Sequence, residues 1–435
     1  MNPYSGDWHQ GTDNYKSWRK TWYKQPQTPE WALGVYSWLQ LHINSPEQEW
    51  RIQFKDLPKY AEECVRYGVS AIQLVGWNNG GQDGGNPSHD PDPHMGTWQE
   101  LKDAIAACEK MGVHIILFNK YTWADQTTEW FHKELIKYSI KTPYGDHGAG
   151  GGYSYQTPTQ LAGINTHPLI PMCQNDERWR EIADREFVKS IVLGASGMLY
   201  DECQHHGGSN YCFDKTHGHH VPVYSFYGDI PLVKGFREII ARKNPDYLIS
   251  GEACYDFENQ YYSLAYFRID PYWQTQIKRY INPNGAIMVA ATGFNDRVML
   301  NACLRYRYII SYEPFNFKGK LSDFPMTVEY GKKVDALRKQ YRDYVWDGEF
   351  RDVLEASVTE DGKNYPSYSV YRHAGGNKHA VVVVNNDASK EKTVEVKIDG
   401  STQPMVYVTP ENLMPQSYTG KVNIPAKSAV VVMEK

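Results

Sequence analysis

The sequence predicts an α/β fold in which a (β/α)8 TIM barrel is followed by a small C-terminal antiparallel β-sandwich. Apolar strand-like segments alternate with amphipathic helix-like segments up to about residue 350. The strand-like segments are apolar on both faces, which is typical of a parallel sheet covered by helices. Beyond them, short alternating strands are separated by turn residues, as in a sandwich. We therefore expect an N-terminal extension or linker at residues 1–30, a catalytic barrel at 31–350 and a sandwich at 351–435.

The first units of the barrel are predicted from hydrophobic periodicity and from capping residues. Residues 31–38 are short and apolar and are expected to be the first strand, while residues 57–65 carry apolar side chains at helical spacing. Residues 71–77 are the next expected strand. Thr97 and Glu100 fit a capping box, which predicts that the second helix begins at this point.

The later units continue the alternation. Strands are expected at 113–118, 197–203, 247–254, 286–290 and 308–312, and helices at 128–140, 177–193, 229–242 and after Pro325. The Gly/Pro/Tyr-rich stretch 141–174 is too long for a connector, so we expect an excursion over a binding face. Leu-Gln-Leu-His follows Trp38, where an open nucleotide-binding sheet would have a Gly-rich loop. These segments give roughly eight strands over about 315 residues, which fits a closed barrel.

The C-terminal part is predicted as a sandwich from its alternation and its turns. Its strands are expected at 370–371, 380–384, 393–398, 405–408 and 428–433. Asp-Gly, Gly-Gly and Asn-Asn-Asp turn residues separate these segments, which favours antiparallel pairing.

Composition and charge exclude some classes of partner. The 46 Lys and Arg nearly balance the 51 Asp and Glu, and they are scattered along the chain, so we expect no nucleic-acid partner. We expect no membrane partner, because no apolar stretch approaches the ~20 residues of a membrane span. The first ten residues lack the features of a secretory signal, and the localisation and oligomeric state stay open. The seven cysteines include no CxxC pair, so mostly thiols are expected.

Two carboxylates are expected at the ends of consecutive barrel strands. Asp201 follows the apolar Gly-Met-Leu-Tyr, and Glu252 follows Leu-Ile-Ser-Gly one unit later. The C-terminal ends of barrel strands carry the chemistry of this fold. Two carboxyl groups across one pocket are what glycoside hydrolysis requires, so we assign Asp201 as nucleophile and Glu252 as general acid/base of a retaining reaction. A separation of about 5–5.5 Å would fit retention, and one beyond ~6.5 Å would not.

Other assignments of these carboxylates stay open. Either acid could instead form an ion pair with a barrel Arg or Lys. Glu202 competes with Asp201, because successive strand residues point to opposite faces. Asp125, Asp256 and Glu313 are weaker candidates, and Glu313 is expected at the barrel mouth, holding a sugar hydroxyl.

A sugar-binding surface is predicted from rings and polar groups near the expected strand ends. Flat rings stack on the apolar faces of pyranoses, while amides and charged groups bind the hydroxyls. The rings are those of Trp38, Trp77, Tyr121 and Trp123, and the polar groups are His42, Asn78, Lys120, Glu202, His205 and Glu313. The alternative for each ring is packing at the rim of the barrel.

A cluster of histidines and cysteines raises the question of a metal. The loop after Asp201 contains Cys203, His205, His206, Cys212, His217, His219 and His220. Thiolate and imidazole suit zinc, but the spacing matches no common zinc finger, and His-rich substrate loops are frequent. The loop 83–92, with Asp90 and Asp92, has oxygen ligands for calcium, although its prolines favour a plain rigid loop. We predict neither a metal nor another cofactor.

Short motifs in this sequence resemble those of a known protein family. The chain resembles an uncharacterised family of bacterial TIM-barrel proteins similar to glycoside hydrolases, which is distantly similar to the α-amylase superfamily and to endo-α-N-acetylgalactosaminidases. Leu-Tyr-Asp201, Gly-Glu252, Val-Val-Asn385-Asn386 and the N-terminal Gly-Asp-Trp-His carry it. The resemblance implies an Asp nucleophile after the fourth strand and a Glu acid/base after the fifth, which coincide with Asp201 and Glu252. Leu199 stands where α-amylases have an Arg, so no substrate or linkage is implied.

The sequence thus predicts a glycoside hydrolase that cleaves an oligo- or polysaccharide. A non-catalytic carbohydrate-binding barrel would share the aromatic rings. A metal-dependent hydrolase would use the His/Cys-rich loop instead of the two carboxylates.

Overall fold

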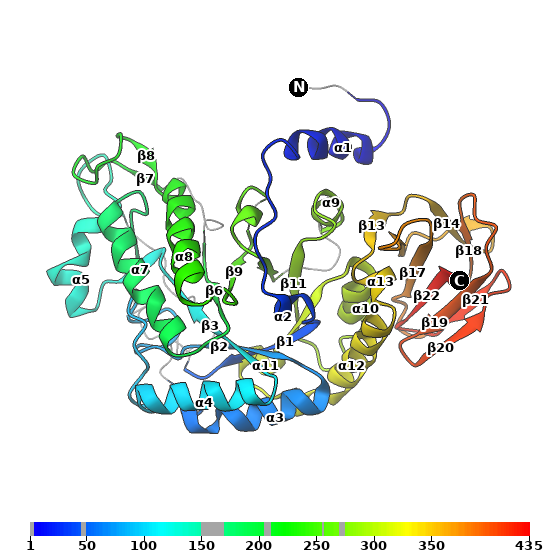
Figure 1. Ribbon diagram of the computed structural model, residues 1–435, viewed down its shortest axis with the longest axis horizontal. Helices are drawn as coiled ribbons and strands as arrows, with labels where there is room; N and C mark the ends of the chain where they lie inside the picture. The colour runs from blue at the N-terminus through cyan, green and yellow to red at the C-terminus, as the bar shows by residue number, and fades with distance from the viewer. Residues whose placement is uncertain (1–3, 45–48, 149–168, 204–209, 255, 269–274) are drawn as a thin grey trace. The chain divides into compact units, whose positions relative to one another are not determined.

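The computed structural model describes residues 4–44, 49–148, 169–203, 210–254, 256–268 and 275–435. Eight parallel strands close into a barrel in the order β1-β2-β3-β6-β9-β10-β11-β12, and antiparallel sheets follow (Figure 1). The predicted fold class is therefore confirmed. The barrel strands are β1 (Ser37–His42), β2 (Ala71–Val75), β3 (His114–Asn119), β6 (Gly197–Tyr200), β9 (Leu248–Glu252), β10 (Leu264–Phe267), β11 (Ala286–Ala291) and β12 (Ile309–Tyr312).

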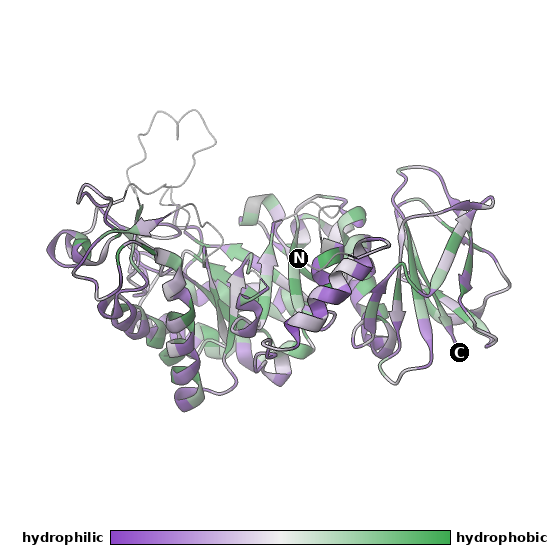
Figure 2. Ribbon diagram, turned by 90° about the horizontal axis from the view of Figure 1, so that it is seen from above, coloured by the Kyte–Doolittle hydropathy of each residue, from purple (hydrophilic) through white to green (hydrophobic). Residues whose placement is uncertain are grey.

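The predicted helices at 57–65, after Thr97, at 177–193, at 229–242 and after Pro325 are present, and the structure has further helices that were not predicted. The helices are α1 (Trp8–Arg19), α2 (Glu30–Leu33), α3 (Leu57–Tyr67), α4 (Trp98–Lys110), α5 (Glu129–Lys133), α7 (Glu177–Val192), α8 (Asp229–Lys243), α9 (Thr275–Ile281), α10 (Arg297–Tyr306), α11 (Pro314–Phe317), α12 (Pro325–Gln340) and α13 (Arg342–Val345). The capping box of α4 is present. The Glu100 amide donates a hydrogen bond to Thr97 Oγ1 at 3.2 Å, and the Thr97 amide donates one to Glu100 Oε2 at 2.7 Å. In Figure 2 the barrel strands are mainly hydrophobic, while the outer helices carry both kinds of residue.

Several elements of the barrel differ from the prediction. The expected strand 31–38 is wrong, because Glu30–Leu33 form α2 and β1 begins only at Ser37. All six residues of β1 are buried, including polar ones, so hydrophobicity alone misplaced it. The short strand β10 was not predicted. The expected helix 128–140 is α5 followed by a 3-10 turn, since Glu134 has the non-helical φ of −136°.

Two loops at the C-terminal ends of the barrel strands carry short elements of their own. The segment between β3 and α7 contains β4 (Trp123–Asp125) and β5 (Leu169–Pro171), which pair antiparallel. The segment between β6 and α8 contains the pair β7 (Tyr211–Cys212) and β8 (Val223–Tyr224). The first segment includes the stretch 141–174, which was expected to be an excursion, whereas no excursion was predicted for the second.

The C-terminal sheets form a sandwich with an aliphatic core. One has the order β13-β16-β17-β22-β19-β20 and the other β15-β14-β18-β21. Their strands are β13 (Glu349–Asp352), β14 (Ala356–Glu360), β15 (Lys363–Asn364), β16 (Tyr368–Arg372), β17 (His379–Asn385), β18 (Lys392–Ile398), β19 (Met405–Thr409), β20 (Asn412–Ser417), β21 (Val422–Ile424) and β22 (Ser428–Glu434). Buried valines from both sheets, such as Val358, Val381 and Val396, make up the core.

The chain divides into two compact units. One consists of Gln25–Tyr266 and Phe317–Gly319, and the other of Met1–Lys24, Phe267–Asn316 and Lys320–Lys435. The domain boundaries near residues 30 and 350 stay predictions. Among the described residues, we find no helix that is both long and apolar enough to cross a bilayer.

Candidate active site

Three neighbouring barrel strands, β3, β6 and β9, end in register. A charged residue directly follows β3 and β6, and a charged residue is the last one of β9. Asn119 of β3 pairs with Tyr200 of β6, and Tyr200 pairs with Gly251 of β9. The next residues along the three strands are Lys120, Asp201 and Glu252. Parallel strands in register place these three residues at the same end of the barrel.

Asp201 directly follows β6, the fourth barrel strand, and Glu252 is the last residue of β9, the fifth. The backbone amide of Glu202 donates a hydrogen bond of 3.2 Å to Glu252 Oε2. The chain turns sharply after each acid, because Glu202 and Ala253 have left-handed φ values of 53° and 49°. Non-glycine residues rarely adopt this conformation, so the two turns are strained positions that the surrounding structure must hold.

Lys120 lies among three carboxylates. Its ammonium nitrogen is 2.8 Å from Asp201 Oδ2 and 2.8 Å from Glu202 Oε2, and it also bonds Asp83. The Lys120 side chain is only 2% exposed. Burial on its own lowers the pKa of Lys120, but the charges of Asp201, Asp83 and Glu202 outweigh it and raise the pKa well above its ordinary value. Lys120 is therefore a permanent cation in this site.

His89 holds the backbone of Lys120. Its Nε2 accepts a hydrogen bond of 3.2 Å from the Lys120 amide, and its own amide donates to Glu186 Oε2 at 2.8 Å. Burial, together with the charge of Lys189, lowers the pKa of His89 to about 3, so the ring is neutral and can accept. The sequence analysis missed both His89 and the contact to Asp83, because neither residue ends a strand.

Close packing supports the strand that carries Glu252. The Cys203 thiol donates to the backbone oxygen of Glu252 at 3.2 Å and lies 3.8 Å from Cys254 Sγ. A Cβ on Gly251 would approach these two sulfur atoms to 2.9 and 2.6 Å. Only glycine fits at that position without displacing its neighbours.

A buried carboxyl group lies under the same turn. Tyr262 donates from its hydroxyl to both oxygens of Asp229, at 3.1 and 3.0 Å. Burial raises the pKa of Asp229 to about 7, against the hydrogen bond from Tyr262, which lowers it.

The four rings predicted to bind sugar differ in their position and in their burial. Trp38 was predicted to follow a strand, but it lies near the start of β1. It pairs there with Ala71 and is 1% exposed. Trp77 and Tyr121 are fully buried, and Trp77 Nε1 donates to the backbone oxygen of Phe118 at 2.9 Å. Trp123, at the start of β4, is partly exposed. Of the four, Trp123 is thus the one that is not buried.

The predicted polar groups are also spread over several environments. His42 ends β1 and stacks on Phe317 with ring centroids 4.4 Å apart. Asn78 donates to the backbone oxygen of Gly84 at 3.1 Å. Glu313 follows β12 in the other unit, is fully buried, and accepts a 2.8 Å hydrogen bond from Ser311. His205 lies outside the described residues.

The remaining carboxylates have other partners. Asp125 accepts from the Gly85 amide at 2.9 Å, and Asp256 is partly buried in the loop after Glu252. In the loop 83–92, Asp90 pairs with Lys189 at 2.8 Å. Asp92 accepts from Asn44 and Trp50 at 3.0 Å each.

The His/Cys-rich loop separates into different environments. Cys212, His217 and His219 come together with Cys173, a residue from the preceding excursion that the sequence analysis did not include. Cys203 instead faces Cys254, and His220 is exposed. His205 and His206 lie outside the described residues. All seven cysteines are buried thiols.

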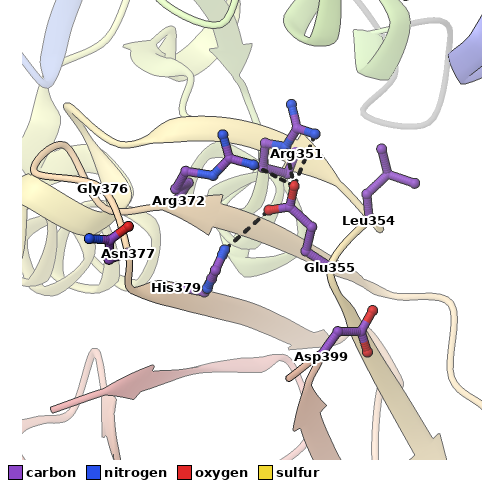
Figure 3. A pocket seen from close by; sticks show the side chains of 8 residues that line it. All are labelled: Arg351, Leu354, Glu355, Arg372, Gly376, Asn377, His379 and Asp399. Carbon is purple, nitrogen blue, oxygen red and sulfur yellow. Dashed lines mark hydrogen bonds and ion pairs between the residues drawn. The ribbon is translucent and has the colours of Figure 1, made fainter. Parts of the chain in front are cut away.

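A pocket on the sandwich contains Glu355, which is paired with three basic side chains (Figure 3). Glu355 accepts from Arg351 at 3.0 Å, from Arg372 at 2.5 Å and from His379 at 3.1 Å. The pocket contains none of the strand-end carboxylates, so we base the candidate active site on the barrel.

The fold and the strand-end acids define a (β/α)8-barrel protein with carboxylates at the C-terminal end of its strands. Within this class, the chain belongs to the family described as a domain of unknown function, DUF6259, which matches residues 1–289. No curated protein matches the chain in sequence.

Solved structures of the α-amylase group share the fold. The α-amylase of Geobacillus thermoleovorans, complexed with acarbose, is 14% identical with a TM-score of 0.61, and the match covers 94% of this chain and 99% of that one. The trehalose-6-phosphate hydrolase of Bacillus licheniformis is 11% identical with a TM-score of 0.63, covering 94% and 100%. The maltogenic α-amylase AmyB of Thermotoga neapolitana is 10% identical with a TM-score of 0.62, covering 93% and 99%. These likenesses extend over both barrel and sandwich, while similarity to endo-α-N-acetylgalactosaminidases stays a prediction.

Proposed function

We propose that this protein is a glycoside hydrolase in which Asp201 is the nucleophile and Glu252 the general acid/base. The observation that carries the proposal is the register of β3, β6 and β9, which places Lys120, Asp201 and Glu252 side by side at one end of the barrel. Two carboxylic groups that act on one glycosidic bond must lie on either side of a single pocket. The fold shared with glycoside hydrolases of the α-amylase group supports this proposal.

The reaction follows from the two acids. The Asp201 carboxylate attacks the anomeric carbon, the bond to the leaving oxygen breaks, and Glu252 gives its proton to that oxygen. Glu252, now a carboxylate, takes a proton from water as the water displaces Asp201 from the sugar. Lys120 keeps Asp201 ionised and thus ready to attack, because an adjacent cation favours the charged form of a carboxyl group.

The substrate class is a carbohydrate, an oligo- or polysaccharide. Trp123, partly exposed at the start of β4, is the ring we propose to stack on a sugar. The polar groups His42, Asn78, Glu202, His205 and Glu313 stay predictions for hydroxyl binding.

An activity screen tests the proposal. It covers α- and β-linked aryl glycosides and plant, mucin and microbial polysaccharides, with wild-type protein and the Asp201→Asn variant in parallel. We expect release of aglycone or reducing sugar by the wild type and its loss in the variant. Activity that is equal in both proteins would rule out Asp201 as the nucleophile.

A second candidate, a non-catalytic carbohydrate-binding barrel, is favoured by one contact. Asp201 and Glu202 are both bonded to the buried Lys120, an ion-pair network that would serve stability alone equally well. Binding of a glycan in calorimetry, with no hydrolysis of any substrate in the screen, would favour this candidate.

A further inference from the structure

Four metal-ligating side chains converge at a place where two long loops meet. Cys173 follows β5 in the β3–α7 excursion, whereas Cys212, His217 and His219 come from the β6–α8 loop. Their ligand atoms all lie within 4.8 Å of one another. Cys173 Sγ is 3.3 Å from His219 Nε2, and Cys212 Sγ is 3.3 Å from His217 Nδ1. A tetrahedral zinc site with bonds of about 2.0–2.3 Å has neighbouring ligand atoms about 3.3–3.8 Å apart, so little movement is needed.

The outer nitrogen of each imidazole ring is already engaged. His217 Nε2 lies 2.9 Å from the backbone oxygen of Lys137, and His219 Nδ1 lies 2.9 Å from that of His220. A carbonyl can only accept, so these contacts place the proton on the outer nitrogen and leave the inner nitrogen with its lone pair facing the cluster. Metal-bound histidines are held in this way by backbone carbonyls and carboxylates. Asp214, 3.5 Å from His217 Nε2, adds a carboxylate to the same side.

The two sulfur atoms belong to buried side chains, and each lies 3.3 Å from an imidazole nitrogen of the cluster. Zinc binds cysteine as thiolate, and a divalent cation at the centre would stabilise both thiolates at once.

The ligand set, two soft sulfur atoms and two imidazole nitrogens, favours one kind of metal. Two thiolates and two imidazoles in tetrahedral geometry are typical of zinc, whereas calcium and magnesium require oxygen ligands. Four protein ligands leave no open position for water or substrate, which makes the site structural and not catalytic.

We propose that Cys173, Cys212, His217 and His219 bind one zinc ion in a closed tetrahedral site that fastens the β3–α7 excursion to the β6–α8 loop. These loops begin at Lys120 and Asp201 respectively, directly after β3 and β6. In the described parts of both loops the helices and strands are short, and the core cluster around the two cysteines adds only Ile140 and Val223. A metal would supply the rigidity that so small a core lacks. The proposal is independent of the proposed hydrolase activity.

Metal analysis of the full-length protein tests the site. The protein is produced with zinc in the medium, passed over a desalting column and measured by elemental analysis against protein concentration. We expect about one zinc per chain in the wild type and less than about 0.1 in Cys173→Ser/Cys212→Ser. Cys108→Ser and His220→Ala are the matched controls, a buried cysteine and a neighbouring histidine outside the ligand set, and both should retain about one zinc.

Cobalt substitution gives a second readout that needs no variant. Apo-protein prepared with a strong chelator and loaded with Co²⁺ should show the intense visible bands of tetrahedral cobalt together with thiolate-to-cobalt absorption in the near ultraviolet. Zinc added in equimolar amount should remove these bands.

Several results would overturn the proposal. These are a wild type with neither zinc nor a tetrahedral cobalt spectrum, full zinc content in the double variant, and a different metal in place of zinc. A Cys173–Cys212 disulfide, identified by mass spectrometry of non-reduced peptides, would also overturn it, whereas a thiol count alone would not distinguish it from a Cys203–Cys254 disulfide.

Discussion

The ammonium nitrogen of Lys120 lies 2.8 Å from a carboxylate oxygen of Asp201. Two further carboxylates, those of Asp83 and Glu202, bond the same nitrogen. The formal charges of one ammonium group and three carboxylates sum to −2. In the proposed reaction, a negative site beside the sugar ring would stabilise a transition state with oxocarbenium character.

Loss of the central cation should destabilise the protein strongly. Lys120→Met leaves Asp83, Asp201 and Glu202 in a largely buried site without their counter-ion, and we expect a loss of about 3–5 kcal/mol in the free energy of unfolding. Urea denaturation measures it. Lys133→Met, which removes a surface ion pair with Glu129, is the control and should change stability by less than about 1 kcal/mol.

A double-mutant cycle checks the cause of that loss. Lys120→Met/Asp83→Asn should be less destabilised than the sum of the two single variants, because each single change leaves a partner unpaired. Additive effects would show that Lys120 and Asp83 do not interact, contrary to the structure.

Gly251 should not tolerate a methyl group. Gly251→Ala would bring a Cβ to 2.6 Å from Cys254 Sγ and 2.9 Å from Cys203 Sγ, so we expect a loss of about 1–3 kcal/mol and a lower turnover, since Glu252 is the next residue. Gly34→Ala is the control, because its Cβ would meet its nearest neighbour only at 3.7 Å. Equal stability of the two variants in urea would contradict the packing described for β9.

The buried carboxyl group of Asp229 predicts a pH dependence of stability. Its pKa is about 7 in the folded protein and near 3.8 when unperturbed. Between pH 3.8 and pH 7 the folded state keeps a proton that the unfolded state has released. The stabilisation that this proton gives the folded state is therefore fully present below pH 3.8 and is lost as the pH rises to 7. The total change is on the order of 4 kcal/mol.

Asp229→Asn isolates that contribution, because it keeps the shape and an acceptor for Tyr262. The difference in unfolding free energy between wild type and variant should fall steadily from pH 4 to pH 7 and then level off. Other titrating groups cancel in the difference. Parallel stability curves would mean that Asp229 titrates normally.

The stereochemistry of the product tests the double displacement. Two successive inversions at the anomeric carbon return the original configuration, so proton NMR of the first-formed sugar should show the same anomer as the substrate. Appearance of the opposite anomer before mutarotation would assign an inverting reaction, with Asp201 as a base and not a nucleophile.

Local features were predictable from the sequence, and long-range ones were not. The capping box of Thr97 and Glu100 depends on residues three apart, and the apolar runs before Asp201 and Glu252 mark strand ends directly. The start of β1 was misplaced, because the strand includes Gln40 and His42, which are polar but buried. The positions of Asp83, His89 and Cys173 depend on contacts between loops, which have no signature in the local sequence.

The most direct test of the central claim is the turnover of Asp201→Asn and Glu252→Gln on a substrate that the wild type cleaves, with folding verified by thermal denaturation. We expect kcat/KM to fall by about 10²–10⁴-fold or more in each, whereas Asp256→Asn, a carboxylate of the same loop as Glu252, should stay near the wild type. Near-wild-type rates in both active-site variants, or a collapse in Asp256→Asn with Glu252→Gln still active, would contradict the assignment.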